Sequence, residues 1–90
     1  MLFMVIEHFK NRDAKAIYRR AQEQGRMLPE GLRYIDSWVE AKFDRCFQLM
    51  ECDDLTLFQQ WVIQWQDLAE FEIVPVVKSA DTSRLISPIL

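Results

Sequence analysis

The sequence has few of the residues that build common metal and cofactor sites. Its 90 residues include a single histidine, His8, and two cysteines, Cys46 and Cys52, which are not arranged as CxxC. A structural zinc ion takes four nitrogen or sulfur ligands, so we predict no metal site and interpret both cysteines as buried structural residues. The glycine-rich dinucleotide motif, the phosphate loop, GxSxG and HExxH are also missing. We therefore predict a protein without a cofactor.

Long apolar runs and a basic charge excess are missing too. No stretch approaches the ~18–20 apolar residues that cross a bilayer, and no secretory leader follows Met1. We therefore expect no membrane association and a cytoplasmic location. The 11 lysines and arginines stand against 14 aspartates and glutamates, which leaves a net charge of −3. An acidic chain gains little from releasing the counterions of a phosphate backbone, so nucleic acid is not an expected partner.

The apolar pattern of the chain predicts one domain with the order strand, helix, strand, strand, helix, strand. A polar segment precedes the first helix, and Asp13 or Asn11 is its expected N-cap, with Gly25 as its left-handed stop. Asp53 and Asp54 are expected to begin the second helix. The predicted bounds are 2–9, 32–40, 45–52 and 71–78 for the strands and 14–25 for the first helix.

This element order is the split βαβ pattern of an α+β, ferredoxin-like βαββαβ sandwich. Right-handed crossovers place strands 2–9 and 45–52 in the centre of a four-stranded antiparallel sheet, with the two helices on one face. Pro75 supports this order, because proline cannot donate to a sheet ladder and is typical of edge strands. We assign residues 1–78 to this domain and residues 79–90 to a C-terminal arm.

The first strand is apolar on both of its faces. Two helices cover only one face of a four-stranded sheet, so the other face would leave apolar side chains in water, at a cost of about 25 cal/mol per Å². We therefore expect a second copy of the chain to cover it, as a two-fold homodimer with the sheets face to face. The side chains concerned are Phe3, Val5 and Phe9 on one face and Leu2, Met4 and Ile6 on the other.

Several short strings resemble a family of short bacterial proteins described only as a domain of unknown function. They are the Met-Val-Ile-Glu start, Ser37-Trp38-Val39, the run Phe-Gln-Leu-Met-Glu-Cys-Asp-Asp, and Phe-Glu-Ile-Val-Pro-Val after a tryptophan-rich helix. The resemblance spans residues 1–78. It implies a dimeric α/β barrel, in the superfamily that includes small antibiotic-biosynthesis-type monooxygenases, muconolactone isomerase-like enzymes and stress-responsive barrel proteins. It implies no activity, because the family has none assigned.

The register between strands 32–40 and 45–52 decides which side chains face a pocket. We favour an even register, because it gives one aliphatic face for packing under the helices and one mixed aromatic and polar face for a ligand. An odd register would instead group Tyr34, Asp36 and Trp38 with Phe47, Leu49 and Glu51. The even register predicts a pocket face of Tyr34, Asp36, Trp38, Cys46, Gln48, Met50 and Cys52, and a helix-packed face of Ile35, Val39, Phe47 and Leu49. From the pocket face we select Tyr34, Trp38, Gln48 and Met50 as the ligand-binding residues.

Four residues are candidates for acid–base catalysis. His8 is the only imidazole, the group that commonly exchanges protons near neutral pH. Glu7 and Glu51 end strands that we expect to be adjacent and parallel, where two carboxylates could share a proton. Asp36 would act as a base if it were buried. Each candidate also has an alternative without catalysis. His8 would be a partly exposed histidine, Glu7 and Glu51 would be solvated carboxylates, and Asp36 would be an interface residue.

Two functions are compatible with these residues. The first is a barrel that binds a small aromatic or polyketide-like molecule and can act as a cofactor-independent enzyme. The second is a non-catalytic dimeric module for structure or protein interaction. The first function requires a cavity that holds an ionisable group with a shifted pKa, whereas the second requires that space to be filled by side chains.

Overall fold

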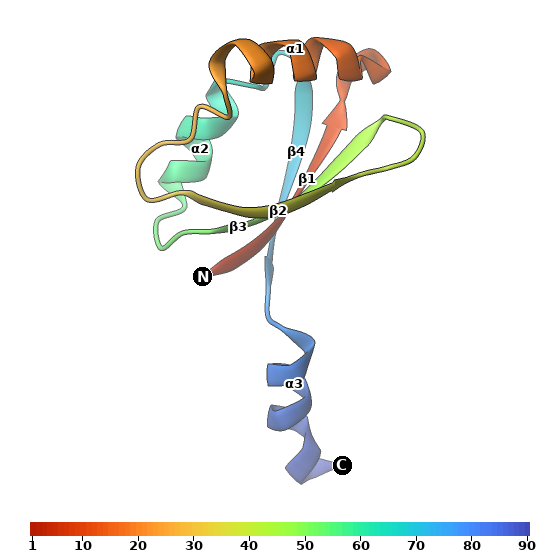
Figure 1. The fold of residues 1–90 in the computed structure, drawn as a ribbon. Helices are drawn as coiled ribbons and strands as arrows, with labels where there is room; N and C mark the ends of the chain where they lie inside the picture. Colours follow the sequence, from red (N-terminus) through yellow and green to blue (C-terminus); the bar gives the residue numbers. More distant parts are fainter.

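The computed structural model describes residues 1–90 and contains the predicted order of strands and helices (Figure 1). The strands are β1 (Leu2–Phe9), β2 (Arg33–Val39), β3 (Arg45–Glu51) and β4 (Ala69–Val76). The helices are α1 (Ala14–Gln24), α2 (Thr56–Ile63) and α3 (Ser79–Ile86), with 3-10 turns at Lys10–Arg12 and Ser87–Ile89. The βαββαβ order is confirmed, and one further helix follows it.

The ends of the helices follow from the residues beside them. The Asp13 side chain accepts a hydrogen bond from the Ala16 backbone N–H at 3.1 Å, as an N-cap carboxylate does. Gly25 ends α1 with a φ of 69°, a conformation that glycine adopts without a Cβ clash. Asp54 lies two residues before α2, and its Oδ1 accepts a hydrogen bond from the Thr56 N–H at 2.9 Å at the start of the helix. The predicted first helix is therefore confirmed to within one residue.

The four strands form one antiparallel sheet in the order β2-β3-β1-β4. Strands β1 and β3 are central, as predicted, and β4 is an edge strand that tolerates Pro75. The expectation that β1 and β3 run parallel at Glu7 and Glu51 is wrong. Glu7 lies opposite Cys46, whereas Glu51 lies opposite Leu2 at the other end of the pair. The two carboxylates therefore cannot share a proton.

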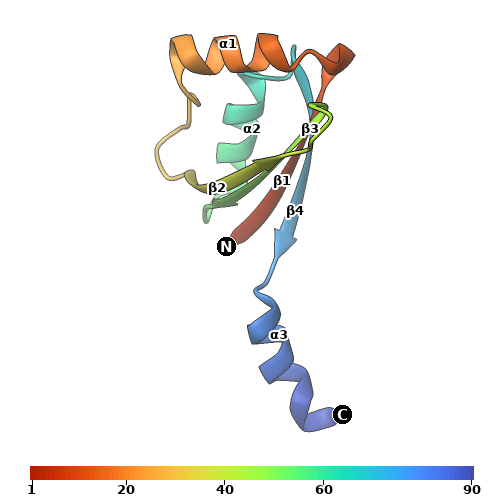
Figure 2. The ribbon, with the colours of Figure 1, turned by 45° about the vertical axis from the view of Figure 1, so that its right-hand side comes forward.

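Helices α1 and α2 lie on one side of the curved sheet (Figure 2). Helix α1 crosses one end of the sheet, and α2 runs beside the strands (Figure 1). The Arg20 guanidinium joins the two helical segments through two hydrogen bonds of 2.7 Å to the Asp67 carboxylate and one of 3.0 Å to the Gln64 carbonyl. Because α1 is held at the end of the sheet, it leaves space between itself and the strands.

The face of the sheet under the helices, called here the covered face, holds the core. Phe3 and Phe58 pack edge to face at 4.9 Å between ring centroids, and Trp61 and Phe71 do the same at 5.3 Å. On the central strands, the covered face consists of Phe3, Val5, Glu7 and Phe9 from β1 and Cys46, Gln48 and Met50 from β3, all of which are buried.

The opposite face, called here the open face, has no layer of this chain over it. Phe47 and Leu49 lie on it, which corrects the prediction that they pack under the helices. The face of β3 that packs under the helices carries Cys46 and Gln48 instead. The open face includes Leu2, Met4, Ile6 and His8 from β1, Arg45, Phe47, Leu49 and Glu51 from β3, Arg33, Asp36 and Trp38 from β2, and Glu70, Glu72, Val74 and Val76 from β4.

The C-terminal arm projects away from the sheet (Figure 1). Its residues form α3 and a final 3-10 turn, and none of them is buried. The arm contributes to the 49 Å length of the molecule along its longest axis. The structure has no helix whose length and apolar character would let it cross a bilayer.

Candidate functional site

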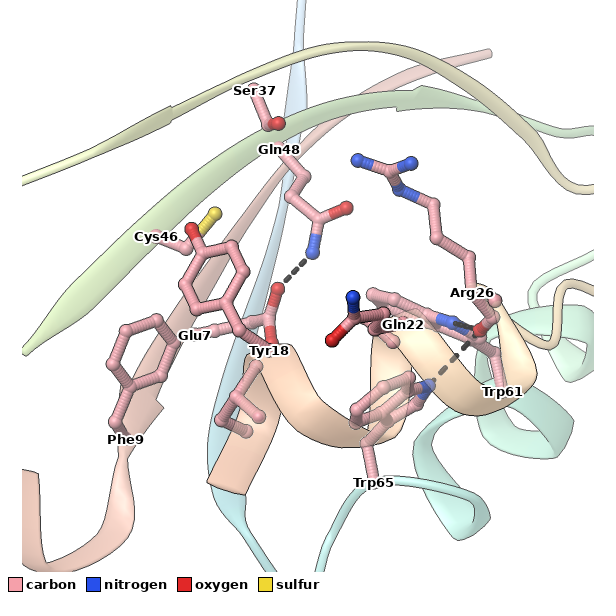
Figure 3. Close-up of a pocket in the computed structure, with 13 residues that line it drawn as sticks. Glu7, Phe9, Tyr18, Gln22, Arg26, Ser37, Cys46, Gln48, Trp61 and Trp65 are labelled. Carbon is pink, nitrogen blue, oxygen red and sulfur yellow. Dashed lines mark hydrogen bonds between the residues drawn. The ribbon is translucent and has the colours of Figure 1, made fainter. Parts of the chain in front are cut away.

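A cavity of about 530 Å³ lies between the covered face, α1 and α2. All three contribute to its lining, and Trp61 of α2 and Trp65, two residues beyond the end of α2, form one wall (Figure 3). Both tryptophans are buried. The polar lining side chains are Glu7, Tyr18, Gln22, Arg26, Ser37 and Gln48.

Glu7 is the buried acid of this cavity. It is only 4% exposed, and burial raises its pKa from 4.5 to about 7, with the positive charge of Arg26 opposing part of that rise. The Gln48 side-chain amide donates a hydrogen bond to the Glu7 carboxyl (Figure 3). The other amide atom, Gln48 Oε1, is buried without a hydrogen-bond partner. The cavity therefore contains a carboxyl group that changes protonation near neutral pH beside a free acceptor.

Cys46 lines the cavity beside Glu7 but is not a nucleophile. Burial and, to a smaller extent, the nearby Glu7 raise the pKa of its thiol from 9.0 to about 12, while Arg26 acts in the opposite sense. The thiolate is the reactive form of cysteine, so a thiol with this pKa stays protonated and inert at neutral pH. Both Cys46 and Cys52 are free and buried, which confirms their interpretation as buried structural residues.

Arg26 is the cation of the site, and sequence reasoning did not select it. Its backbone carbonyl accepts hydrogen bonds from the Trp61 indole at 2.9 Å and the Trp65 indole at 3.0 Å. Its guanidinium lies over the Tyr34 ring, 3.5 Å from the centroid, as a cation–π contact. Gly25 precedes it with a positive φ, so a turn at the end of α1 directs the chain toward the cavity. The signal in the sequence was this basic residue directly after a helix-ending glycine.

A β-bulge in β2 decides which of its side chains reach the cavity. Tyr34 lies opposite Met50, but Asp36 lies opposite Leu49, so Ile35 is the extra residue. The bulge places Tyr34 and Ser37 on the same face, and their hydroxyl oxygens are 2.6 Å apart. The Asp36 side chain accepts from the Ser37 backbone N–H at 2.8 Å and so supports the irregular backbone.

The predicted even register is therefore correct at Tyr34 and wrong beyond the bulge. Asp36 and Trp38 lie on the open face, opposite Leu49 and Phe47, away from the cavity. Trp38 is 52% exposed and does not contribute to the lining. One inserted residue moves every following side chain to the other face, which is why a uniform register gives the wrong assignment.

The remaining candidates divide between the two faces. Gln48 lines the cavity, and Met50 is fully buried beneath it without lining it. His8 lies on the open face, where its Nε2 is 2.9 Å from the Glu72 carboxylate. Glu51 pairs with Arg33 at the far end of β3. Of the four predicted catalytic candidates, the structure brings only Glu7 to the cavity.

No group of three or more histidine, cysteine, aspartate or glutamate side chains in the structure is arranged to hold a metal ion. Within the cavity, Glu7, Gln48 and Arg26 lie among aromatic walls.

By its element order, its sheet order and its single helical layer, the chain is a ferredoxin-like α+β protein. It belongs to the family described as a domain of unknown function, DUF3303, whose model matches residues 1–90. The match includes the arm, so the expected extent of the resemblance, residues 1–78, is too short. No curated protein and no solved structure matches the chain.

Proposed function

We propose that the protein binds a small planar organic molecule, aromatic or polyketide-like, in the cavity, and that Glu7 exchanges a proton with it without a cofactor. The observation that carries this proposal is a buried carboxyl group at the wall of a cavity, with a pKa of about 7. Ionisable groups with pKa values displaced by burial are concentrated at functional sites.

The cavity supports a ligand of this shape. Its volume of about 530 Å³ falls within the range of small-molecule pockets. Phe9, Trp61 and Trp65 supply aromatic walls, and aromatic rings pack well against flat faces. A few polar groups among apolar walls are typical of a ligand pocket, because they orient the ligand that the walls bind.

Glu7 supplies the chemistry. Near pH 7 its ionised and protonated forms are present in comparable amounts, which suits a general acid–base catalyst. The carboxylate takes a proton from an acidic C–H or O–H bond of the ligand, becomes the neutral acid, and returns that proton at another ligand atom. Such an isomerisation conserves atoms and electrons, so it requires no redox cofactor.

The proposal is tested with 2-naphthol, a planar aromatic probe, and isothermal titration calorimetry. Wild-type protein should bind it, and Ala21→Trp, which places an indole in the cavity, should weaken binding by at least about ten-fold. Lys15→Trp is the matched control, because Lys15 is an exposed residue of α1 outside the cavity. Absence of binding to wild type, or equal binding to Ala21→Trp, would contradict the proposal.

We also propose that the protein is a homodimer that associates through the open face. Trp38, Val74 and the partly exposed Leu49 lie on this face without a covering layer. Exposed apolar patches of this kind mark interaction surfaces, and a two-fold contact lets one patch cover the same patch on a second copy.

The dimer is tested by sedimentation velocity at micromolar concentration. Leu49→Glu puts two symmetry-related carboxylates into the interface, so it should weaken association at least about 100-fold while keeping the fold. Lys15→Glu, on the opposite side of the molecule, should leave association unchanged. A wild-type monomer under these conditions would overturn the dimer. A dimer that binds no planar probe would instead favour the second candidate, a non-catalytic dimeric module, which the apolar open face supports.

A further inference from the structure

We infer that the ligand of the cavity is an aromatic carboxylate that also carries a hydroxyl group, whose carboxylate pairs with Arg26 and whose hydroxyl donates to Gln48. This inference rests on the proposed function and goes further by naming the chemical class of the ligand.

The first observation is the charge of Arg26. It is the only cation that lines the cavity, and its guanidinium has no ion pair or hydrogen bond with a carboxylate of this chain. Arg20 and Arg45, by contrast, are each paired with an acidic side chain. A guanidinium stacked on a ring keeps its N–H groups free at its edge, where they match the two oxygens of a carboxylate.

The second observation is that Arg26 is held in place. Its guanidinium lies on the Tyr34 ring, and two indole N–H groups bind its backbone carbonyl. The Tyr34 hydroxyl is in turn fixed by Ser37 through the bulge. A preorganised cation loses little conformational freedom on binding, which favours recognition of one anionic group at one position.

The third observation is the unpartnered acceptor of Gln48. Gln48 is 6% exposed, and its Oε1 has no hydrogen-bond partner while its amide nitrogen is used by Glu7. Figure 3 shows the amide oxygen directed away from Glu7, toward the side of the cavity where Arg26 lies. A buried acceptor without a donor is costly, so a ligand hydroxyl that donates to it is favoured.

The cavity wall near these two polar positions is aromatic. Trp61 and Trp65 line it, and their faces favour an aromatic ring as the part of the ligand that carries the carboxylate and the hydroxyl. A flexible aliphatic chain could join the same two groups, but it would lose more conformational entropy and would not stack on the indoles. The amide nitrogen of the same Gln48 binds Glu7, so one side chain connects the ligand hydroxyl to the group that we propose to exchange a proton.

The test compares four naphthalene probes of similar size by calorimetry on the full chain: 6-hydroxy-2-naphthoate, 2-naphthoate, 2-naphthol and 6-methoxy-2-naphthoate. Wild type should bind 6-hydroxy-2-naphthoate at least about ten-fold more tightly than each of the other three. In Arg26→Gln the advantage of 6-hydroxy-2-naphthoate over 2-naphthol should fall below about two-fold. In Gln48→Met the advantage of 6-hydroxy-2-naphthoate over 6-methoxy-2-naphthoate should likewise fall below about two-fold.

Arg19→Gln is the matched control, because Arg19 is an exposed cation of α1 that does not line the cavity. It should reproduce the wild-type preferences. If 2-naphthol binds wild type as tightly as 6-hydroxy-2-naphthoate, the inference is wrong and the proposed function stands. If no probe binds wild type, the proposed function fails. The wild-type probe series decides the matter even if Gln48→Met does not fold.

Discussion

Polar and apolar side chains are distributed over the two faces of this sheet differently from those of an ordinary half-exposed sheet. Antiparallel sheets with one covered face usually turn apolar residues inward and polar residues to water. In this protein the covered face buries Glu7 and Gln48, whereas the open face leaves Trp38 and Val74 partly in solvent. Buried polar groups and exposed apolar patches are the informative exceptions in a small domain, and here each face supplies one of them.

The comparison shows that one sheet can carry two separable properties. The polar residues of the covered face surround a cavity, so they are available to a ligand. The apolar residues of the open face lie on the other side of the same strands, so they are available to a second copy of the chain. Because side chains alternate along a strand, neighbouring residues such as Glu7 and His8 belong to different environments.

The largest contrast is expected between truncating an aromatic side chain that packs against the covered face and truncating one on the open face. Phe58 of α2 is 2% exposed and packs against Phe3, so Phe58→Ala should lower the free energy of unfolding by about 3–5 kcal/mol. Trp38→Ala on the open face should cost less than about 1 kcal/mol. Both are measured by urea denaturation in a Leu49→Glu background, so that association does not contribute. Equal losses would show that the two faces do not differ in packing.

The next contrast concerns the pH dependence of stability. Because burial raises the pKa of Glu7 above 4.5 to about 7, the folded chain binds this proton more tightly than the unfolded chain. The resulting stabilisation is fully present below about pH 4.5 and is lost as the pH rises through about 7, an effect of about 3 kcal/mol.

Glu7→Gln removes this ionisation while a side-chain oxygen remains to accept from Gln48. The variant should therefore lose less stability than wild type between about pH 5 and about pH 8, and should be the more stable protein at the upper end. Urea denaturation across this range measures the difference. Parallel pH profiles for the two proteins would show that the Glu7 pKa is not raised.

The smallest effect is expected for a carboxylate on the open face. Glu72 lies 2.9 Å from His8, and both side chains are substantially exposed, at 59% and 40%. Ion pairs between exposed groups contribute between about 0 and 1 kcal/mol, so Glu72→Gln should change stability by no more than this. Double-mutant analysis with His8→Gln measures the pair directly. A larger coupling would indicate that this pair is desolvated, as it would be inside a dimer interface.

Much of the fold could be predicted because its signals are local. The bounds of β1 follow from its run of apolar residues, and those of α1 follow from Asp13 and Gly25. The site was less accessible to sequence reasoning. The sequence suggested Glu7 as the partner of Glu51 and Gln48 as a pocket residue beside Trp38. Neither of those groupings occurs in the structure.

By itself, the sequence determined the element order, the helix ends, the edge position of Pro75 and the apolar character of both faces of β1. These properties depend on interactions between residues that are close along the chain. The tertiary structure alone decided that β2 bulges at Ile35, that Arg26 is anchored by Trp61, and that Gln48 binds Glu7. Those contacts join residues 35 and 41 positions apart, so they depend on how the folded layers pack.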